Sequence, residues 1–422
     1  MEKDMNFGDR IKIIFSKEEY EGILLESPEK GIVLLKLDSG YNIGLNKKDI
    51  LNFKLIKKAR EIEDVVEIKK VKDKPNIAMI ITGGTIASCL DPKTGGVDPL
   101  TDPKDLFKFY PELFDKVNVI KVEVPFMKAS EDMNFKDWQK IARIAEKLLN
   151  DNNVKGIIVT HGTDFLNYTS AVLSFFLRNL NKPVILTYSQ RSIDRASSDA
   201  NLNLQCSALA AISDIAEVML VGHANSDDDF CYAMPGAKVR KLHTSRRDAF
   251  KVVNSKPFAK IFNDRIERIS KYNLRGKSKK VKLDLKFEEK VALVKIYPGQ
   301  DPNILDFYLK NKYKGIVLEM AGLGHVPMKK ANLSWIKKLI EVQKKGLIVC
   351  AAAQCINGRL DPLVYSNGRE LLETGIIYLE DMLSETALVK LGWILGHKEW
   401  KNKIKEKMLE NIAGELNKRL EE

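Results

Sequence analysis

Two short segments of the sequence carry threonine hydroxyls in settings that favour nucleophilic chemistry. A Thr-Gly-Gly-Thr motif at 82–85 and a His-Gly-Thr-Asp motif at 161–164 each follow an apolar run that is typical of a buried parallel strand. In open α/β sheets, ligands bind beyond the carboxyl ends of such strands. The two motifs therefore predict one active site that contains Thr85, Thr163 and Asp164.

The residue types around these motifs suggest attack on an amide carbonyl. A threonine hydroxyl is a weak nucleophile at neutral pH and needs a base or a nearby cation to remove its proton. Asp164 supplies a carboxylate, and Lys241, in a polar stretch further along the chain, could supply an amine. A Thr–Lys–Asp relay could then activate one threonine. The backbone N–H groups of the turns at Gly84 and Gly162 would contact the substrate and stabilise its oxyanion.

Each motif also has a purely structural interpretation. Thr-Gly-Gly-Thr alone could be an ordinary tight turn, and Thr163 or Asp164 could cap the helix that follows. We expect His161 to be a packed or hydrogen-bonded histidine rather than a catalyst. Because both motifs lie at strand ends within one domain, the catalytic interpretation is favoured.

The motifs belong to a region, 76–285, in which strand-like and helix-like segments alternate. Such alternation predicts right-handed crossovers and a mostly parallel sheet covered on both faces. A smaller α/β unit is expected at 286–422, and its last part, 398–422, is expected to form a charged amphipathic helix. The expected strands of the first region are 77–81, 117–124, 156–160, 183–187 and 217–222, and its expected helices are 136–150, 165–179 and 199–211.

Residues 1–57 are expected to form a separate small domain. Four strand-like runs, about ten residues apart and separated by turn residues, predict an all-β barrel of SH3-like size. This domain contains no histidine and only scattered carboxylates, so it is interpreted as a docking or binding module. Mixed charges at 58–75 predict a solvent-exposed linker between this barrel and the α/β region.

The composition sets the remaining limits. No apolar run in the 422 residues approaches the length of a membrane span, and the first residues do not resemble a secretory signal. The five cysteines are odd in number and form no CxxC pair, which favours reduced thiols in a cytoplasm and no zinc site. The net charge of +12 favours an anionic partner such as nucleic acid, although a lysine-rich proteome would explain it equally well.

Taken together, the two motifs resemble the signature pair of the bacterial-type L-asparaginase/glutaminase family, over roughly 76–397. The resemblance implies an asparaginase-like two-domain parallel-sheet fold, here preceded by the small barrel. The residues that it assigns to catalysis are Thr85 as nucleophile, with Thr163, Asp164 and Lys241. The residues that it assigns to the substrate's α-carboxylate and α-amine are Ser130 and Glu131, in an Ala-Ser-Glu-Asp-Met-Asn segment.

Further segments resemble archaeal glutamyl-tRNA(Gln) amidotransferase D subunits, so that this second resemblance spans nearly the whole chain. They are the barrel and the runs at 189–200, 241–250, 322–327, 354–359, 365–372 and 379–390. The resemblance implies a glutaminase that passes ammonia to a partner, the amidotransferase E subunit, which activates Glu-tRNA(Gln) with ATP and Mg. It implies no metal or cofactor in this chain, and self-association through the asparaginase-like domains.

Two other functions stay open: a free-standing cytoplasmic L-asparaginase, and a binding protein built on an inactive asparaginase fold. The inactive fold remains possible because Pro92 stands near the position where relatives have a tyrosine that assists the threonine. A second departure is Tyr188-Ser189 before Gln-Arg, where Gly-Ala is usual. The sequence leaves open how Thr85 is activated and whether glutamine or asparagine is preferred.

Overall fold

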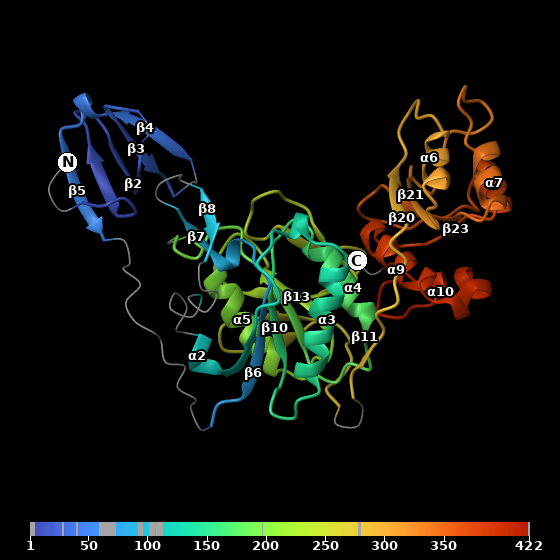
Figure 1. Ribbon diagram of the computed structural model, residues 1–422, viewed down its shortest axis with the longest axis horizontal. Coiled ribbons are helices and arrows are strands. Elements are labelled where there is room, and N and C mark those ends of the chain that lie inside the picture. The colour runs from blue at the N-terminus through green and yellow to red at the C-terminus, as the bar shows by residue number, and fades with distance from the viewer. Residues whose placement is uncertain are drawn as a thin grey trace.

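The structure is a computed structural model of the chain. It describes residues 5–27, 29–38, 41–58, 73–91, 96–100, 106, 113–195, 197–276 and 280–420. Most of the predicted linker, 59–72, and the position of Pro92 therefore lie outside the described residues. Figure 1 shows three parts: a small β domain, a central domain built on the largest sheet, and a C-terminal domain on the other side of the central one.

The N-terminal domain is a five-stranded antiparallel sheet. In pairing order its strands are β4 (Asn42–Asn46), β3 (Ile32–Lys36), β2 (Glu19–Leu25), β1 (Arg10–Ile14) and β5 (Asn52–Lys57), with a 3-10 helix at Lys47–Asp49. Alternate side chains, such as Ile11 and Ile13 of β1, point into a small core. The sequence predicted four of these strands and missed β5, in which the half-buried Phe53 and Leu55 alternate with exposed residues.

The central domain contains an eight-stranded sheet. In pairing order its strands are β18 (Ile266–Arg268), β17 (Ala259–Ile261), β14 (Cys231–Pro235), β13 (Val218–His223), β12 (Val184–Thr187), β10 (Ile157–Thr160), β6 (Asn76–Ile81) and β9 (Asn118–Glu123). Neighbouring strands among β13, β12, β10, β6 and β9 are parallel, as predicted, whereas β14, β17 and β18 pair in antiparallel fashion. These three strands were not predicted, and two of them, β17 and β18, are only three residues long.

Helices cover both faces of this sheet, and short two-stranded pairs extend from it (Figure 1). The helices are α2 (Leu113–Lys116), α3 (Phe135–Leu149), α4 (Leu166–Phe176) and α5 (Ala200–Ile212). Helix α4 is buried all round except at Tyr168, which fits the apolar residues that it carries on all sides. The short pairs are β7 (Ser88–Leu90) with β8 (Val97–Pro99), β11 (Leu177–Arg178) with β19 (Lys282–Leu283), and β15 (Val239–Lys241) with β16 (Phe250–Val252).

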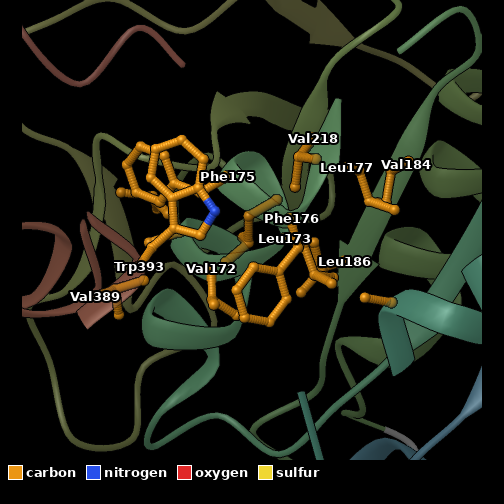
Figure 2. Packing of buried hydrophobic residues seen from close by; sticks show 14 of the residues in the cluster. Val172, Leu173, Phe175, Phe176, Leu177, Val184, Leu186, Val218, Val389 and Trp393 are labelled. Carbon is orange, nitrogen blue, oxygen red and sulfur yellow. The ribbon is translucent and has the colours of Figure 1, made fainter. Parts of the chain in front are cut away.

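The C-terminal domain has a parallel four-stranded sheet of β20 (Val291–Lys295), β21 (Gly315–Met320), β22 (Ile348–Ala353) and β23 (Ile377–Tyr378). Its helices are α6 (Ile304–Lys310), α7 (Ile336–Lys344), α8 (Ser366–Glu373) and α9 (Ser384–Leu395). Figure 2 shows Trp393 of α9 against Phe175 of α4, and their rings stack with centroids 5.5 Å apart. One hydrophobic core therefore runs from the central domain into the C-terminal domain.

The prediction of one long terminal helix over 398–422 is wrong. A 3-10 helix at Lys398–Lys403 and α10 (Ile404–Leu409) are short, and residues 410–420 contain no helix. The fully buried Lys390 of α9 explains this, because its Nζ donates to the carbonyls of Met408 and Glu410 and lies 2.5 Å from a carboxylate oxygen of Glu415. The tail folds back to satisfy this ammonium instead of continuing as a helix.

The buried pair of Lys390 and Glu415 gives a stability prediction. Removal of only the cation by Lys390→Met leaves a buried carboxylate, and we expect the free energy of unfolding to fall by about 3–5 kcal/mol. In the double variant Lys390→Met/Glu415→Gln, most of that loss should be recovered, because no buried charge remains. Urea unfolding measures both, and Lys345→Met, which removes an exposed lysine paired with Glu341, is the control. Equal losses in the single and double variants would contradict the electrostatic explanation.

Candidate active site

Three turns meet at the carboxyl ends of the adjacent strands β9, β6 and β10, and they contact one another through their backbones. Gly83 and Gly84 have φ angles of 112° and 82°, which other residues rarely adopt. A Cβ atom on Gly83 would lie 2.5 Å from the carbonyl oxygen of Lys128, and one on Gly84 would lie 2.4 Å from the nitrogen of Gly162. Only glycine permits this approach, which brings the two predicted motifs together.

Hydrogen bonds hold the three turns in register. The hydroxyl of Thr82 donates to the carbonyl of Thr160 at 2.7 Å, and the N–H of Lys128 donates to the carbonyl of Thr82 at 2.9 Å. Thr82 is fully buried, so these bonds are shielded from water. The first threonine of the Thr-Gly-Gly-Thr motif is therefore a structural residue.

Thr85, the predicted nucleophile, begins a 3-10 helix (Thr85–Ala87) directly after the two glycines. Its side chain is half-buried, and within the described ranges its hydroxyl makes no hydrogen bond. The turn itself is fixed, since the N–H of Ala87 and the hydroxyl of Ser88 both donate to the carbonyl of Gly84. A fixed turn whose threonine hydroxyl is not held in a hydrogen bond within the described ranges is suited to attack on a bound substrate.

The predicted relay of Thr163, Asp164 and Lys241 is brought together by the fold. The Nζ of Lys241 donates to Thr163 Oγ1 at 2.8 Å and to Asp164 Oδ1 at 2.7 Å. The Lys241 side chain is 13% exposed, whereas that of Asp164 is 59% exposed. An ion pair with one exposed partner adds little to stability, so its geometry is better explained by chemistry at the site.

The strand that carries Lys241 is attached to the C-terminal domain. Lys238 Nζ lies 2.6 Å from Asp381 Oδ2, and Arg240 Nε lies 2.9 Å from Glu385 Oε1. Lys238, directly before β15, and Arg240 within it alternate with Val239 and Lys241. Because successive side chains of a strand point to opposite faces, one face meets the C-terminal domain and the other meets the relay. Neither ion pair was predicted from the sequence, although the two-residue period of the cations could have indicated them.

The predicted substrate-binding residues lie beside the relay. The hydroxyl of the buried Ser130 accepts the N–H groups of Asp164 at 3.1 Å and Phe165 at 3.3 Å, and it lies 3.3 Å from Glu131 Oε2. Ser130 therefore connects its turn to that of the relay. Glu131 is exposed at the surface of the site. Their contact with substrate stays a prediction.

His161 is a structural residue, as expected from the sequence. It is fully buried, its Nδ1 lies 2.7 Å from the carbonyl of Gly162, and its Nε2 lies 2.9 Å from the hydroxyl of Thr169. Both contacts fit a neutral ring that donates from Nδ1 and accepts at Nε2. Burial lowers the pKa of His161 to about 4, so the ring is neutral at physiological pH.

Tyr188, one of the two departures from the family pattern, fills space in the core. Its hydroxyl donates to the carbonyl of Arg247 at 2.8 Å, and its ring lies on Gly222, where a Cβ would be 2.4 Å away. Tyr188 is fully buried, so its role at this position is one of packing. Among the described residues, no group of three or more His, Cys, Asp or Glu side chains is arranged to hold a metal ion.

Comparison with known families agrees with this geometry. The chain matches the models of the N-terminal asparaginase domain over 76–273, the glutaminase/asparaginase C-terminal domain over 290–408 and the GatD N-terminal domain over 5–56. The solved L-asparaginase from Thermococcus kodakarensis is 28% identical with a TM-score of 0.71, covering 82% of this chain and 100% of that one. L-asparaginase I from Vibrio cholerae is 28% identical with a TM-score of 0.69, covering 82% and 99%. Fold and site thus define an asparaginase-type amidohydrolase.

Relatives that match the whole chain narrow this class. The glutamyl-tRNA(Gln) amidotransferase D subunit of Pyrococcus furiosus is 45% identical over 426 residues, covering 98% of this chain and 96% of that protein. The D subunit of Methanococcus maripaludis is 42% identical over 420 residues, covering 98% of each. The chain belongs to the family of glutamyl-tRNA(Gln) amidotransferase D subunits, and the resemblance read from the sequence is confirmed. No helix in the described part of the chain is long and apolar enough to cross a membrane.

Burial of His161 predicts a loss of stability in acid. Its folded pKa is about 4 and its ordinary value is 6.5, so between these values the unfolded chain binds a proton that the folded chain does not. This contribution to stability is complete above pH 6.5 and is lost as the pH falls to 4, at a cost of about 3 kcal/mol. Urea unfolding between pH 7 and 4 should show a shallower decline for His161→Gln than for the unsubstituted chain. Parallel curves would contradict the assignment.

The position of Thr85 predicts a variant that is folded but inactive. Thr85→Ala should lower kcat for release of ammonia from glutamine by about a thousandfold or more, because it removes the nucleophile. The thermal midpoint should not change, because the side chain lies at a turn outside the core. Thr85→Ser, which keeps a hydroxyl, is the matched control and should retain measurable turnover. Normal turnover in Thr85→Ala would show that another group attacks the substrate.

Proposed function

We propose that the chain is the glutaminase subunit of a tRNA-dependent amidotransferase that converts Glu-tRNA(Gln) to Gln-tRNA(Gln). The observation that supports this function most strongly is the hydrogen-bonded set of Lys241, Thr163 and Asp164 beside the Thr85 turn. It occurs in a chain that is similar over almost its full length to amidotransferase D subunits. In this function the chain releases ammonia from glutamine or asparagine, and the amidotransferase E subunit, its partner, uses it.

In the proposed reaction, Thr85 attacks the carbon of the substrate's side-chain carboxamide. Its proton passes through the relay of Thr163 and Lys241 to the leaving nitrogen, so that ammonia departs when the carbon–nitrogen bond breaks. Backbone N–H groups at the turns of Gly84 and Gly162 stabilise the oxyanion of the tetrahedral intermediate. Water then hydrolyses the ester on Thr85 and frees glutamate or aspartate.

The remaining residues of the site bind and orient the amino-acid part of the substrate. The exposed carboxylate of Glu131 is suited to the α-ammonium group, and Ser130 beside it to the α-carboxylate. Asp164 has a second free face, because it is 59% exposed even while it accepts from Lys241. It can therefore both hold the relay lysine and help to bind the substrate's amine.

The proposed complex divides the chemistry between two chains. The partner E subunit phosphorylates the glutamyl end of Glu-tRNA(Gln) with ATP and Mg, so this chain needs no metal or cofactor of its own. The net charge of +12 is compatible with a complex that binds the polyanion tRNA. We further propose that the complex works in the cytoplasm and that the asparaginase-like domains associate with a second copy.

The second candidate is a free-standing L-asparaginase. It is supported by the likeness to solved L-asparaginases, which covers 82% of this chain. The N-terminal domain argues against it, because residues 5–56 match a domain named for the amidotransferase subunit.

Ammonia release distinguishes these functions. The purified chain is assayed with glutamine and with asparagine, alone and then with the E subunit and Glu-tRNA(Gln). We expect the E subunit and tRNA together to raise glutamine turnover by about tenfold or more, as a typical coupling energy allows. High activity that ignores both additions would identify a free-standing asparaginase. No ammonia under any condition would favour a binding protein on an inactive fold.

A further inference from the structure

A loop of the central domain, described at residues 189–195 and 197–199, reaches the N-terminal five-stranded domain, which was predicted to be a barrel and keeps that name here. Arg195 of this loop donates from Nη2 to the carbonyl oxygens of Asp38, at 2.6 Å, and Leu37, at 3.4 Å. Within the barrel, Arg10 donates to both carboxylate oxygens of Asp38, at 2.9 and 2.7 Å, and so anchors the residue that supplies this carbonyl. The guanidinium of Arg195 is therefore a specific contact between the loop and the barrel.

The residues just before Arg195 bind the segment that follows the nucleophile. Asp194 Oδ2 accepts the N–H of Leu90 at 3.0 Å, and the N–H of Ile193 donates to the carbonyl of Ser88 at 3.2 Å. Ser88 in turn donates from its hydroxyl to the carbonyl of Gly84 at 2.9 Å. Only a few hydrogen bonds therefore separate the barrel from the turn that carries Thr85. Figure 1 shows the same arrangement, with β7–β8 on the side of the central domain that faces the barrel.

Hydrogen bonds connect the described parts of this loop, 189–195 and 197–199, to each other. The carboxylate of the buried Asp199 accepts the N–H groups of Gln190, at 2.9 and 3.0 Å, and Arg191, at 3.1 Å. The hydroxyls of Ser189 and Ser198 both donate to the carbonyl of Arg191. These bonds tie the two ends of the loop together, so a force on Arg195 moves Asp194 with it.

Charges at the barrel–loop contact make its geometry sensitive to docking. Lys36 of the barrel lies near both Asp194 and Arg195, and burial together with the Arg195 cation lowers the pKa of Lys36. Asp38, Arg191 and Arg195 also interact electrostatically across the contact. A partner that docks on the barrel, or shifts it, would change the forces on these charged groups.

We propose that Asp194 and Arg195 are positioning residues that connect the barrel to the Thr85 turn, so that the position of the barrel sets the rate of attack by Thr85. This inference rests on the proposed glutaminase function and adds a role for the barrel in it. The substrate-binding residues Ser130 and Glu131 lie on a different turn, after β9. A change at the barrel contact should therefore alter the catalytic rate and leave substrate affinity unchanged.

The test uses the full chain under the condition that gives the highest rate with glutamine. Arg195→Ala and Asp194→Ala should each lower kcat by about tenfold while KM stays within about twofold. Arg195→Lys keeps one donor for the Asp38 carbonyl, and Asp194→Asn keeps an acceptor for the Leu90 N–H, so both should recover much of the loss. The matched control is Arg268→Ala on β18, the far edge strand, which removes a surface arginine paired with Asp214 and should leave kcat unchanged.

A double variant tests whether barrel and loop act as one unit. Arg10→Met loosens Asp38 within the barrel, and it should lower kcat in the presence of Arg195. Once Arg195 is alanine, the same change should have little further effect, because the contact that it supports is already gone. If the fold-losses of kcat in the two single variants multiply in the double variant, barrel and loop act independently, and the proposal is overturned. Values of kcat within twofold of the unsubstituted chain in the single variants would also overturn it.

Hydrogen exchange keeps the test valid if glutamine proves not to be the substrate. Arg195→Ala should speed amide exchange over residues 84–91, which contain the Thr85 turn and β7, whereas Arg268→Ala should not. Failure of the unsubstituted chain to release ammonia, combined with this exchange result, would reject the proposed function and keep the connection. Unchanged exchange over 84–91 would reject the connection itself.

Discussion

The site depends on one steric constraint: three turns touch through bare backbone. Gly84 lies against Gly162, and Gly83 against Lys128, at distances that no Cβ would allow. Each turn ends a different strand, so the contact exists only if β9, β6 and β10 are adjacent, parallel and in register. The large parallel sheet and its buried strand residues thus serve to bring two hydroxyl-bearing segments within reach of one substrate.

The relay lysine needs a second support that the sheet cannot give. Lys241 lies on a two-strand pair outside the main sheet, and Lys238 and Arg240 attach that pair to acidic residues of the C-terminal domain. Lys238 and Asp381 are fully buried, and burial lowers the pKa of Lys238. The loss of hydration of a buried ion pair offsets much of the attraction between its charges, so we infer that this pair mainly fixes one geometry. The C-terminal domain therefore contributes orientation to the catalytic centre although none of the proposed catalytic residues belongs to it.

Local features of the fold and site could be predicted from the sequence, and features that depend on distant contacts could not. The parallel strands and the burial of α4 follow from apolar runs, and the Thr85 and Thr163 turns from glycine after a strand. Strand β5 and the tail after α10 were misread because their conformations depend on neighbours: the core of the barrel, and the buried ammonium of Lys390. The bond from Arg195 to Asp38 spans 157 positions and leaves no local pattern. Motif spacing therefore predicts the candidate catalytic residues but not the distant contacts that orient them.

The position of the contact between barrel and loop also fits the proposed reaction. A glutaminase that feeds a second chain wastes substrate whenever it releases ammonia with no acceptor ready, so control over the catalytic step is worth more than control over substrate binding. Through Arg195 the barrel contacts the loop behind the nucleophile turn, and this loop bonds to the segment that follows Thr85. A module placed there can leave substrate bound while Thr85 is held out of line. Free-standing asparaginases have no acceptor to wait for, so the proposed control by the barrel gives a physical reason for a domain that contacts the loop behind Thr85.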